Sequence, residues 1–211
     1  MKRILIFLML LAPCSLLPIM GQTLSEQEII QKMVSAAKEI RTVQCGFTQT
    51  RHLKMLSKEQ VSQGKMYCQQ PDKLRWEYIS PRASTLIMNG TEVKTLSSSP
   101  TKGEESKAAS LKGGLAGYMA RMIMNSVAGK LLTDGKTFQI TAEETPTEYV
   151  ATLVPTRKEM KRMYAKIVLR FNIRLSTVTQ VEMHEKSGES TIIELQDIRI
   201  NEPINASTFS K

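Results

Sequence analysis

The stretch "QQPDKLRWEYISPRASTLIMNG", residues 69–90, decides the fold. Between its two prolines, apolar and charged side chains alternate, and a short apolar run then ends at Asn89-Gly90. Alternation with a period of two, closed by Asn-Gly, is typical of neighbouring strands in an antiparallel sheet. The stretch therefore predicts strands whose alternate side chains share one face, and that face carries Trp76, the single tryptophan of the chain.

The same two-residue period recurs along most of the chain. Further strands are predicted at residues 43–51, 61–69, 91–96, 137–143, 149–155, 165–172, 177–185 and 191–200. Amphipathic helices are predicted at residues 26–40, after a capping box formed by Ser25 and Glu28, and at residues 115–127. Residues 156–163 predict a helical turn, and the polar, glycine-bounded residues 97–114 predict a mobile loop. About ten strands and two substantial helices indicate a mainly β (α+β) fold built on one strongly curved antiparallel sheet.

The first residues are typical of a secretory signal peptide. Lys2 and Arg3 precede an apolar run, and Gly21 suits the position before a cleavage site. We therefore expect a signal peptide at residues 1–21 and a single domain at residues 22–211, exported to the periplasm. A lipoprotein signal ending at Cys14 is the alternative, disfavoured because Pro13 is rigid where such sites need a flexible residue. No later stretch is long and apolar enough to predict a membrane span.

The chain is basic, with a formal net charge of +9 that falls to +7 when Lys2 and Arg3 are removed. A basic exported protein suits anionic lipid or an acidic partner, or simply carries a basic solvated surface. Nucleic acid is not expected as a partner, because Lys and Arg are scattered rather than clustered with aromatic residues.

Motifs of catalysis and of cofactor binding are missing from the sequence. It contains no HExxH, paired CxxC, GxSxG or phosphate-binding glycine loop, and His52 and His184 stand without a supporting pattern. We expect no enzyme activity, no metal and no cofactor. A hydrolase remains the alternative, and it would need a nucleophile–base pair that uses one of the two histidines.

Two cysteines, Cys45 and Cys68, lie on the first two predicted strands. If Phe47 pairs with Met66, the two cysteines face each other directly. An exported compartment would then oxidise them to a disulfide. The alternative is a pair of small buried apolar side chains, because direct cross-strand geometry strains a disulfide.

Methionine is unusually common, with ten of 13 remaining after residues 1–21 are removed. Flexible methionines suit surfaces that receive variable apolar partners, although each can equally be core filler. Met119, Met122 and Ile123 share one stripe of the second helix, next to the predicted mobile loop. This arrangement indicates a lid that covers an apolar interior.

Several segments together resemble the periplasmic lipoprotein carrier family, LolA, over residues 24–210. The resemblance is carried by "GFTQTR" (46–51), "QQPDKLRWEYISP" (69–81), "LIMNG" (86–90), "KIVLRFN" (166–172), "SGESTIIELQDIRINEPI" (187–204) and Phe209. It implies a curved antiparallel sheet that forms an incomplete barrel, with an apolar concave face covered by helices. The expected cavity residues are Phe47, Met66, Leu74, Trp76, Tyr78, Leu86, Met88, Met119, Met122 and Ile123.

The resemblance also implies a function. A monomeric carrier would receive lipoprotein acyl chains from an inner-membrane ABC-type lipoprotein-releasing complex and pass them to an outer-membrane acceptor. Proteins of similar fold that sense envelope lipoproteins, or that act as the acceptor, are the alternatives. One position departs from the family, where an arginine that helps to hold the lid shut is replaced by Gln70. Glutamine keeps donor capacity but loses the charge and the five-donor fork, so control of the lid is in doubt. Arg75 and Glu77 are expected on the outer, wet face of the same strand.

Overall fold

The structure, a computed structural model, describes residues 24–56, 58–97 and 115–210, with the backbone alone for residues 97 and 115–120. The helices and strands, in chain order, are α1 (Glu26–Lys38), β1 (Thr42–His52), β2 (Gln60–Gln69), β3 (Lys73–Ser80), β4 (Ser84–Asn89), β5 (Glu92–Ser97), α2 (Leu115–Val127), η1 (Lys130–Thr133), β6 (Phe138–Glu144), β7 (Glu148–Pro155), α3 (Lys158–Met163), β8 (Tyr164–Asn172), β9 (Thr177–Glu185), β10 (Ser190–Ile200) and η2 (Ala206–Phe209). The expected signal peptide and the expected loop lie outside the described residues.

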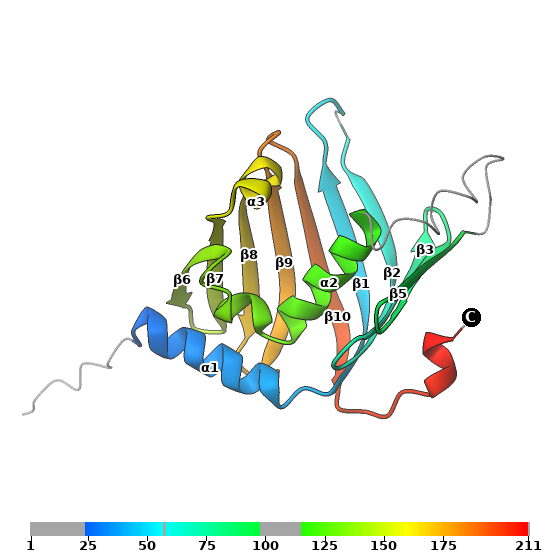
Figure 1. The fold of residues 1–211 in the computed structure, drawn as a ribbon, viewed down its shortest axis with the longest axis horizontal. Coiled ribbons are helices and arrows are strands. Elements are labelled where there is room, and N and C mark those ends of the chain that lie inside the picture. Colours follow the sequence, from blue (N-terminus) through cyan, green and yellow to red (C-terminus); the bar gives the residue numbers. More distant parts are fainter. Residues whose placement is uncertain (1–23, 57, 98–114, 211) are drawn as a thin grey trace, which may run out of the picture.

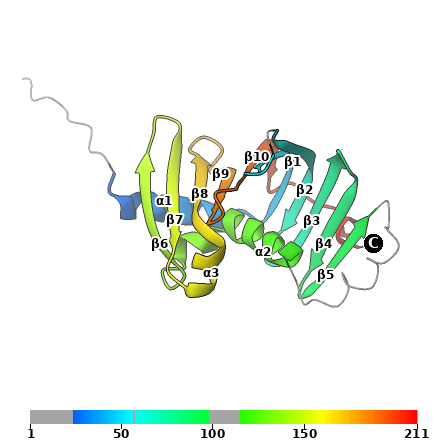
Figure 2. The same cartoon turned by 90° about the horizontal axis from the view of Figure 1, so that it is seen from above.

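All ten strands belong to one antiparallel sheet, in the order β5-β4-β3-β2-β1-β10-β9-β8-β7-β6. β5 and β6 are edge strands, so the sheet bends strongly without closing on itself (Figures 1 and 2). α1 and α2 lie on its concave side (Figure 1). The predicted incomplete barrel with helices over its concave face is confirmed.

α1 begins at the predicted capping box. The Ser25 hydroxyl oxygen accepts a hydrogen bond from the backbone N–H of Glu28 at 3.3 Å, and a Glu28 carboxylate oxygen accepts one from the Ser25 N–H at 2.8 Å. These bonds satisfy N–H groups that a helix start leaves without partners. The helix buries Ile29, Met33 and Val34 and covers the β6–β7 end of the sheet.

The sheet has two arms, formed by β1–β5 and by β6–β9. α2 crosses the concave side between them and contacts β3, β4 and β9 (Figure 2). Its buried side chains include Met122, Ile123 and Val127. Just after the helix, Gly129 has a φ of 66°, and a Cβ atom there would lie 2.8 Å from the Cβ of Ala37 in α1. Glycine thus permits a close approach that ties the C-terminal end of α2 to α1.

The register of β1 and β2 differs from the prediction. Phe47 pairs with Gly64 rather than with Met66, which pairs with Cys45. The physical reason is the Phe47 ring, which lies over the backbone of β2. A Cβ at position 64 would come within 2.5 Å of the ring, so only glycine can stand opposite.

This register places Cys68 opposite Val43, diagonal to Cys45. The expected direct pairing of the cysteines is therefore wrong, and both are free thiols buried on the concave side. Burial raises the pKa of each thiol to about 12, and at Cys45 the nearby Cys68 adds to the effect. The cysteines behave as small apolar side chains, the second of the two interpretations.

Candidate functional site

The structure brings the expected cavity residues together on the concave face of β1–β4 and on the facing side of α2. Phe47, Met66, Leu74, Trp76, Met88, Met122 and Ile123 belong to one buried cluster, and Tyr78 and Leu86 pack against it half-buried. The side chain of Met119 lies outside the described residues. The cross-strand pairs Met66–Trp76, Leu74–Met88 and Trp76–Leu86 explain why these side chains share a face, since directly paired residues project to the same side.

Three aromatic rings organise the centre of this face. The rings of Phe47 and Trp76 are stacked, with centroids 3.9 Å apart, and Tyr78 meets Phe47 edge-on at 5.4 Å. Aromatic pairs of this kind contribute about 0.5–1.5 kcal/mol each beyond their area burial. Because Gly64 leaves room for the Phe47 ring, the group holds Trp76 in one orientation.

Polar atoms begin immediately beside these rings. The Tyr78 hydroxyl donates to the side-chain carbonyl oxygen of Gln49 at 2.9 Å, and burial raises the pKa of Tyr78. The indole Nε1 of Trp76 is buried and makes no hydrogen bond within the described part of the chain. The Tyr78 hydroxyl lies beside the indole, yet the two groups do not meet hydrogen-bond geometry. A buried N–H without a partner is costly, about 1–3 kcal/mol, and is rare in folded proteins.

The apolar face is occupied by the protein itself. Trp76 is 3% exposed and Met66 and Leu74 are fully buried, because α2 fills the space in front of them. Met122 and Ile123 of α2 join the same buried cluster as Trp76. Acyl chains could enter this space only if α2 moved out of it.

The outer face of β3 differs from the expectation in one respect. Arg75 and Glu77 do lie there and form an ion pair at 3.1 Å, but the face is only partly wet. The C-terminal η2 covers it, with Phe209 buried near Ile87 and the Thr208 carbonyl oxygen 3.5 Å from Nη1 of Arg75.

Gln70, the residue expected to affect the lid, lies in the turn between β2 and β3. Its backbone N–H donates to the carbonyl oxygen of Arg41 at 2.8 Å. Its side chain forms no hydrogen bond with any other described residue. A role for Gln70 in holding the lid stays a prediction.

The two histidines lie on β1 and β9, on either side of Ser190 in β10, and each is beside a glutamate. His52 ends β1 and lies 3.1 Å from Glu59, and His184 in β9 lies 3.2 Å from Glu182. Among the described residues, no group of three or more His, Cys, Asp or Glu side chains could hold a metal ion. Ser190 is the cross-strand partner of both histidines, but no hydrogen bond in the described part of the chain joins its hydroxyl to either ring.

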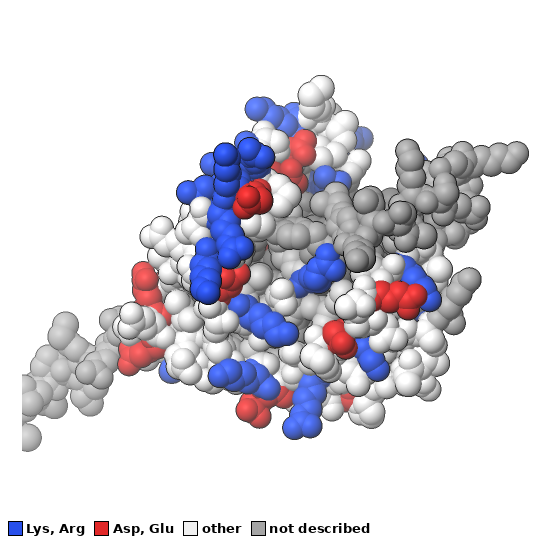
Figure 3. Space-filling model, in the orientation of Figure 1, with Lys and Arg blue, Asp and Glu red and all other residues white. Residues whose placement is uncertain are grey.

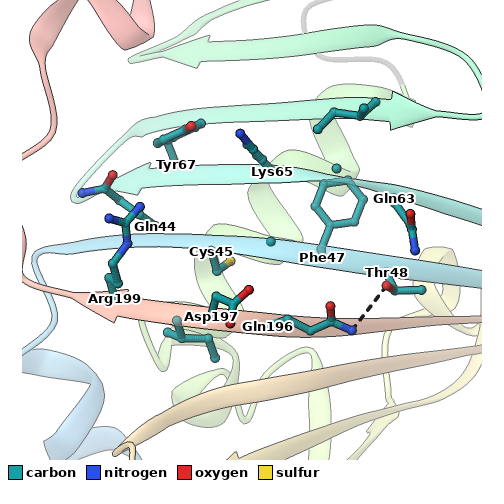
Figure 4. A pocket seen from close by; sticks show the side chains of 14 residues that line it. Gln44, Cys45, Phe47, Thr48, Gln63, Lys65, Tyr67, Gln196, Asp197 and Arg199 are labelled. Carbon is teal, nitrogen blue, oxygen red and sulfur yellow. Dashed lines mark hydrogen bonds between the residues drawn. The ribbon is translucent and has the colours of Figure 1, made fainter.

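A separate groove of about 720 Å³ lies on the opposite, outer face of β1, β2 and β10 (Figure 4). It forms where Gly46 has no side chain and where the β1–β10 register shifts between Gln44 and Gly46. Polar side chains dominate its rim, and Gln196 donates to the Thr48 hydroxyl at 3.4 Å. Its lining as a whole mixes polar side chains with apolar ones such as Ile79 and Ile198.

Basic side chains gather over α3 on the face shown in Figure 3. Lys158, Lys161 and Arg162 of this short helix are all exposed. α3 thus carries a small group of basic side chains on this face of the molecule.

The polar end of the concave face was not predicted from the sequence. Gln49 and Arg51 follow Phe47 at two-residue intervals and therefore project to the same side of β1. Tyr78, which was grouped with the apolar lining, donates its hydroxyl to Gln49. The alternation in "FTQTR" contained this signal, but only the apolar residues were followed.

The fold and its covered apolar face define a lipid- or lipoprotein-binding class of protein. A family model, the outer membrane lipoprotein carrier protein LolA, matches residues 38–211. The chain belongs to the LolA family, whose members are periplasmic or secreted. Among the helices that the structure describes, none has the length and apolar character needed to cross a bilayer. No curated protein matches the chain in sequence.

Solved structures share the fold at low sequence identity. A LolA superfamily protein from Nitrosomonas europaea is 12% identical, with a TM-score of 0.44 over 89% of this chain and 98% of that one. MucB in the MucA/MucB complex of Pseudomonas aeruginosa is 6% identical, with a TM-score of 0.54 over 88% of this chain. That match covers 60% of the solved chain, so this protein corresponds to little more than half of it. The lipoprotein LppX of Mycobacterium tuberculosis is 11% identical, with a TM-score of 0.39 over 86% and 99% of the two chains.

Proposed function

We propose that the protein is a periplasmic carrier that binds the acyl chains of lipoproteins on its concave face and transfers them from the inner to the outer membrane. The observation that carries this proposal is the apolar part of the concave face of β1–β4, which, within the described part of the chain, is covered by α2 rather than by further strands. A face built in this way can exchange its cover for another apolar group without breaking the sheet.

The energetics favour such an exchange. Each methylene group of an acyl chain removed from water contributes about 0.8 kcal/mol, so free chains in the periplasm need a shelter. When α2 leaves the face, Met122, Ile123 and Val127 lose their contacts, and the chains replace much of that buried area. The net affinity is the free energy gained by burying the acyl chains minus the free energy lost when α2 leaves the face. A modest difference between the two allows both uptake and release.

The proposed route of the cargo is the one that the resemblance to the family implies. The carrier would take its cargo from an inner-membrane ABC-type lipoprotein-releasing complex and deliver it to an outer-membrane acceptor. Because the transporter would supply the energy, the carrier itself would need no nucleotide, metal or other cofactor. Residues 1–21 would direct its export, and the domain of residues 22–211 would act as a monomer.

A lipoprotein sensor is the alternative from a different class. MucB, whose solved complex contains MucA, shares the fold at a TM-score of 0.54. A sensor would bind acyl chains on the same face but act through a protein partner. Mass spectrometry of what is captured with the protein from periplasm separates the two, since a carrier yields lipoproteins and a sensor yields a regulator.

The test is a titration of the protein with a synthetic diacylated lipopeptide. Trp76 is the only tryptophan, so its emission reports on the concave face alone. Bound chains should shift the emission and protect the indole from a soluble quencher. Leu86→Glu should weaken binding at least about tenfold, because a charge on an apolar face loses hydration without gaining a partner.

The matched control is Ile79→Glu, which adds the same charge to the outer side of β3 at a position that is 54% exposed. This variant should bind the lipopeptide like the original protein. An unchanged Trp76 emission, combined with no binding heat by calorimetry, would contradict the proposal.

A further inference from the structure

The concave face of β1–β4 changes character from one end of its strands to the other. Along β1 the inward positions are Val43, Cys45 and Phe47, all buried and apolar, and then Gln49 and Arg51. The register places Gln49 opposite Ser62 and Arg51 opposite Gln60 in β2.

β3 and β4 repeat this order. Leu74 and Trp76 are followed by Tyr78, and Met88 and Leu86 lie apolar beside Ser84, the partner of Tyr78. Four neighbouring strands therefore carry apolar groups at one end of the face and polar groups at the other. The polar end lies where β1 ends and β2 begins, at the top of the sheet in Figure 1.

The polar end is hollow. A pocket of about 640 Å³ is lined there by Gln49, Arg51, Gln60, Ser62, Tyr78 and Arg82, among others. We call it the polar pocket. None of its lining residues is acidic, and neither arginine forms an ion pair with any described residue. A half-buried arginine without a counter-charge, such as Arg51, is unfavourable for the empty protein and is suited to an anion that arrives from outside.

Trp76 lies at the boundary between the two ends. Its Nε1 is the buried side-chain nitrogen that has no hydrogen-bond partner among the described residues. Its neighbours in β3 are apolar Leu74 on one side and Tyr78, at the wall of the polar pocket, on the other. An acceptor oxygen at this boundary would satisfy the indole N–H.

We propose that the cargo site accepts a diacyl lipid with an anionic headgroup. The acyl chains lie on the apolar end of the face, an ester carbonyl oxygen accepts the hydrogen bond from Trp76 Nε1, and the headgroup phosphate binds Arg51 and Arg82. The guanidinium groups suit phosphate because they can form paired, charge-assisted hydrogen bonds with it. This inference rests on the proposed function insofar as the same concave face shelters the chains, and it adds anionic phospholipid to lipoprotein as a cargo.

The test compares two short-chain lipids that differ only in headgroup, dihexanoyl phosphatidylglycerol and dihexanoyl phosphatidylcholine. Both are monomeric at low concentration and can be titrated by calorimetry. The original protein should bind the anionic lipid about tenfold more tightly at low salt, and added salt should reduce the difference. Glycerol phosphate, which has the headgroup charge without the chains, should bind much more weakly than either lipid.

Three variants separate the parts of the site. The double variant Arg51→Gln, Arg82→Gln should lose the preference for phosphatidylglycerol. Its binding of phosphatidylcholine should fall less, because the choline cation already offsets the phosphate charge of that lipid. Lys65→Gln is the matched control for each single arginine variant, since it removes one positive charge from an exposed position on the outer face of β2. Trp76→Phe keeps an aromatic ring but removes the N–H, and it should weaken both lipids alike, by about fivefold.

Each outcome of these titrations either supports or overturns the anionic-lipid proposal. Equal affinity for the two lipids in the original protein would overturn the anionic site and leave the proposed carrier intact, whereas failure of both lipids and of the diacylated lipopeptide would remove both. Glycerol phosphate that binds as tightly as the anionic lipid would show a site for a free anion and would overturn the lipid assignment. If the double variant fails to fold, the two single variants and the headgroup comparison in the original protein carry the same decision.

Discussion

The two arms of the sheet use their concave faces differently. In the arm formed by β6–β9, side chains such as Leu153, Ile167 and Leu169 are fully buried, and α1 seals them from one side. In the arm formed by β1–β5, the apolar face gives way to the polar pocket, and Trp76 keeps an indole N–H without a partner in the described part of the chain. One continuous hydrogen-bonded sheet thus joins a packed apolar core to a face that retains polar groups.

The contrast between the two arms indicates which arm contributes most to stability and which arm binds a ligand. The β6–β9 arm buries most of its apolar side chains, as in any protein core, and Thr177 of β9 is a buried polar residue there. The β1–β5 arm retains, on its inner side, polar and charged groups that have no partner among the described residues, which lowers stability unless a ligand satisfies them. Substitutions in the two arms should therefore separate into those that change unfolding and those that change binding.

The largest effect is expected from Leu169→Ala in β8. Leu169 is fully buried, and its truncation leaves a cavity that should lower the free energy of unfolding by about 2–5 kcal/mol. Leu86→Ala, at a half-buried position of the other arm, should cost less stability and should weaken lipopeptide binding. Urea unfolding and calorimetry measure the two quantities. A loss of binding in folded Leu169→Ala, equal to that in Leu86→Ala, would break the distinction between the arms.

A smaller effect is expected from Gly64→Ala in β2. The new Cβ would clash with the carbonyl oxygen of Glu77 and with the Phe47 ring, so the aromatic group must shift, at a cost of about 1–3 kcal/mol. Gly46→Ala is the matched control, because the nearest atoms to its new Cβ are 3.8 Å away. Thermal unfolding should leave the Gly46 variant within about 0.5 kcal/mol of the original protein. Equal stability of the two variants would show that the Phe47 ring does not need the glycine.

The smallest effect concerns the thiols at the apolar end of the β1–β5 arm. Burial raises the pKa of Cys45 and Cys68 from 9.0 to about 12, so both stay protonated in the folded protein at neutral pH. Neither should react with iodoacetamide until the protein is unfolded, and both should then react without prior reduction. Detection of a disulfide in the exported protein would contradict the free thiols.

The same shift gives a pH dependence. The unfolded chain loses the thiol protons above about pH 9 while the folded chain holds them, so the stabilisation is present below pH 9 and is lost as the pH rises toward 12. The double variant Cys45→Ala, Cys68→Ala should show a shallower fall in unfolding free energy over this range. An identical slope would show that other groups account for the alkaline loss.

Much of the fold could be predicted from the sequence because its signals are local. The period of two in "LRWEY", the capping box at Ser25 and the stripe of α2 each follow from neighbouring residues, and β9 has the predicted bounds. The pairing of β1 with β2 could not be predicted in this way. It depends on the Phe47 ring meeting Gly64 across the sheet, a contact that no periodicity reports.

The residues of the candidate site also divide into those that local sequence patterns predict and those that depend on contacts between distant segments. Its apolar half was predictable because alternation assigns Leu74, Trp76 and Leu86 to one face once the strands are known. Its polar half was not found, because Arg82 lies between two strands, where alternation assigns no face, yet it lines the polar pocket. The contact of η2 with Arg75 was not predicted for a similar reason, since η2 lies more than a hundred residues away from Arg75 in the chain.

The close contact of Gly129 with Ala37 has a consequence for how the protein handles cargo. A helix tethered at one end stays within reach of the face that it has left, so its effective concentration there is in the millimolar range whatever the dilution of the protein. In the proposed carrier, cargo therefore competes with a resident helix at every moment. The same competitor would speed the departure of the lipid at its destination and would keep the unloaded molecule from associating with its copies through bare hydrocarbon surface.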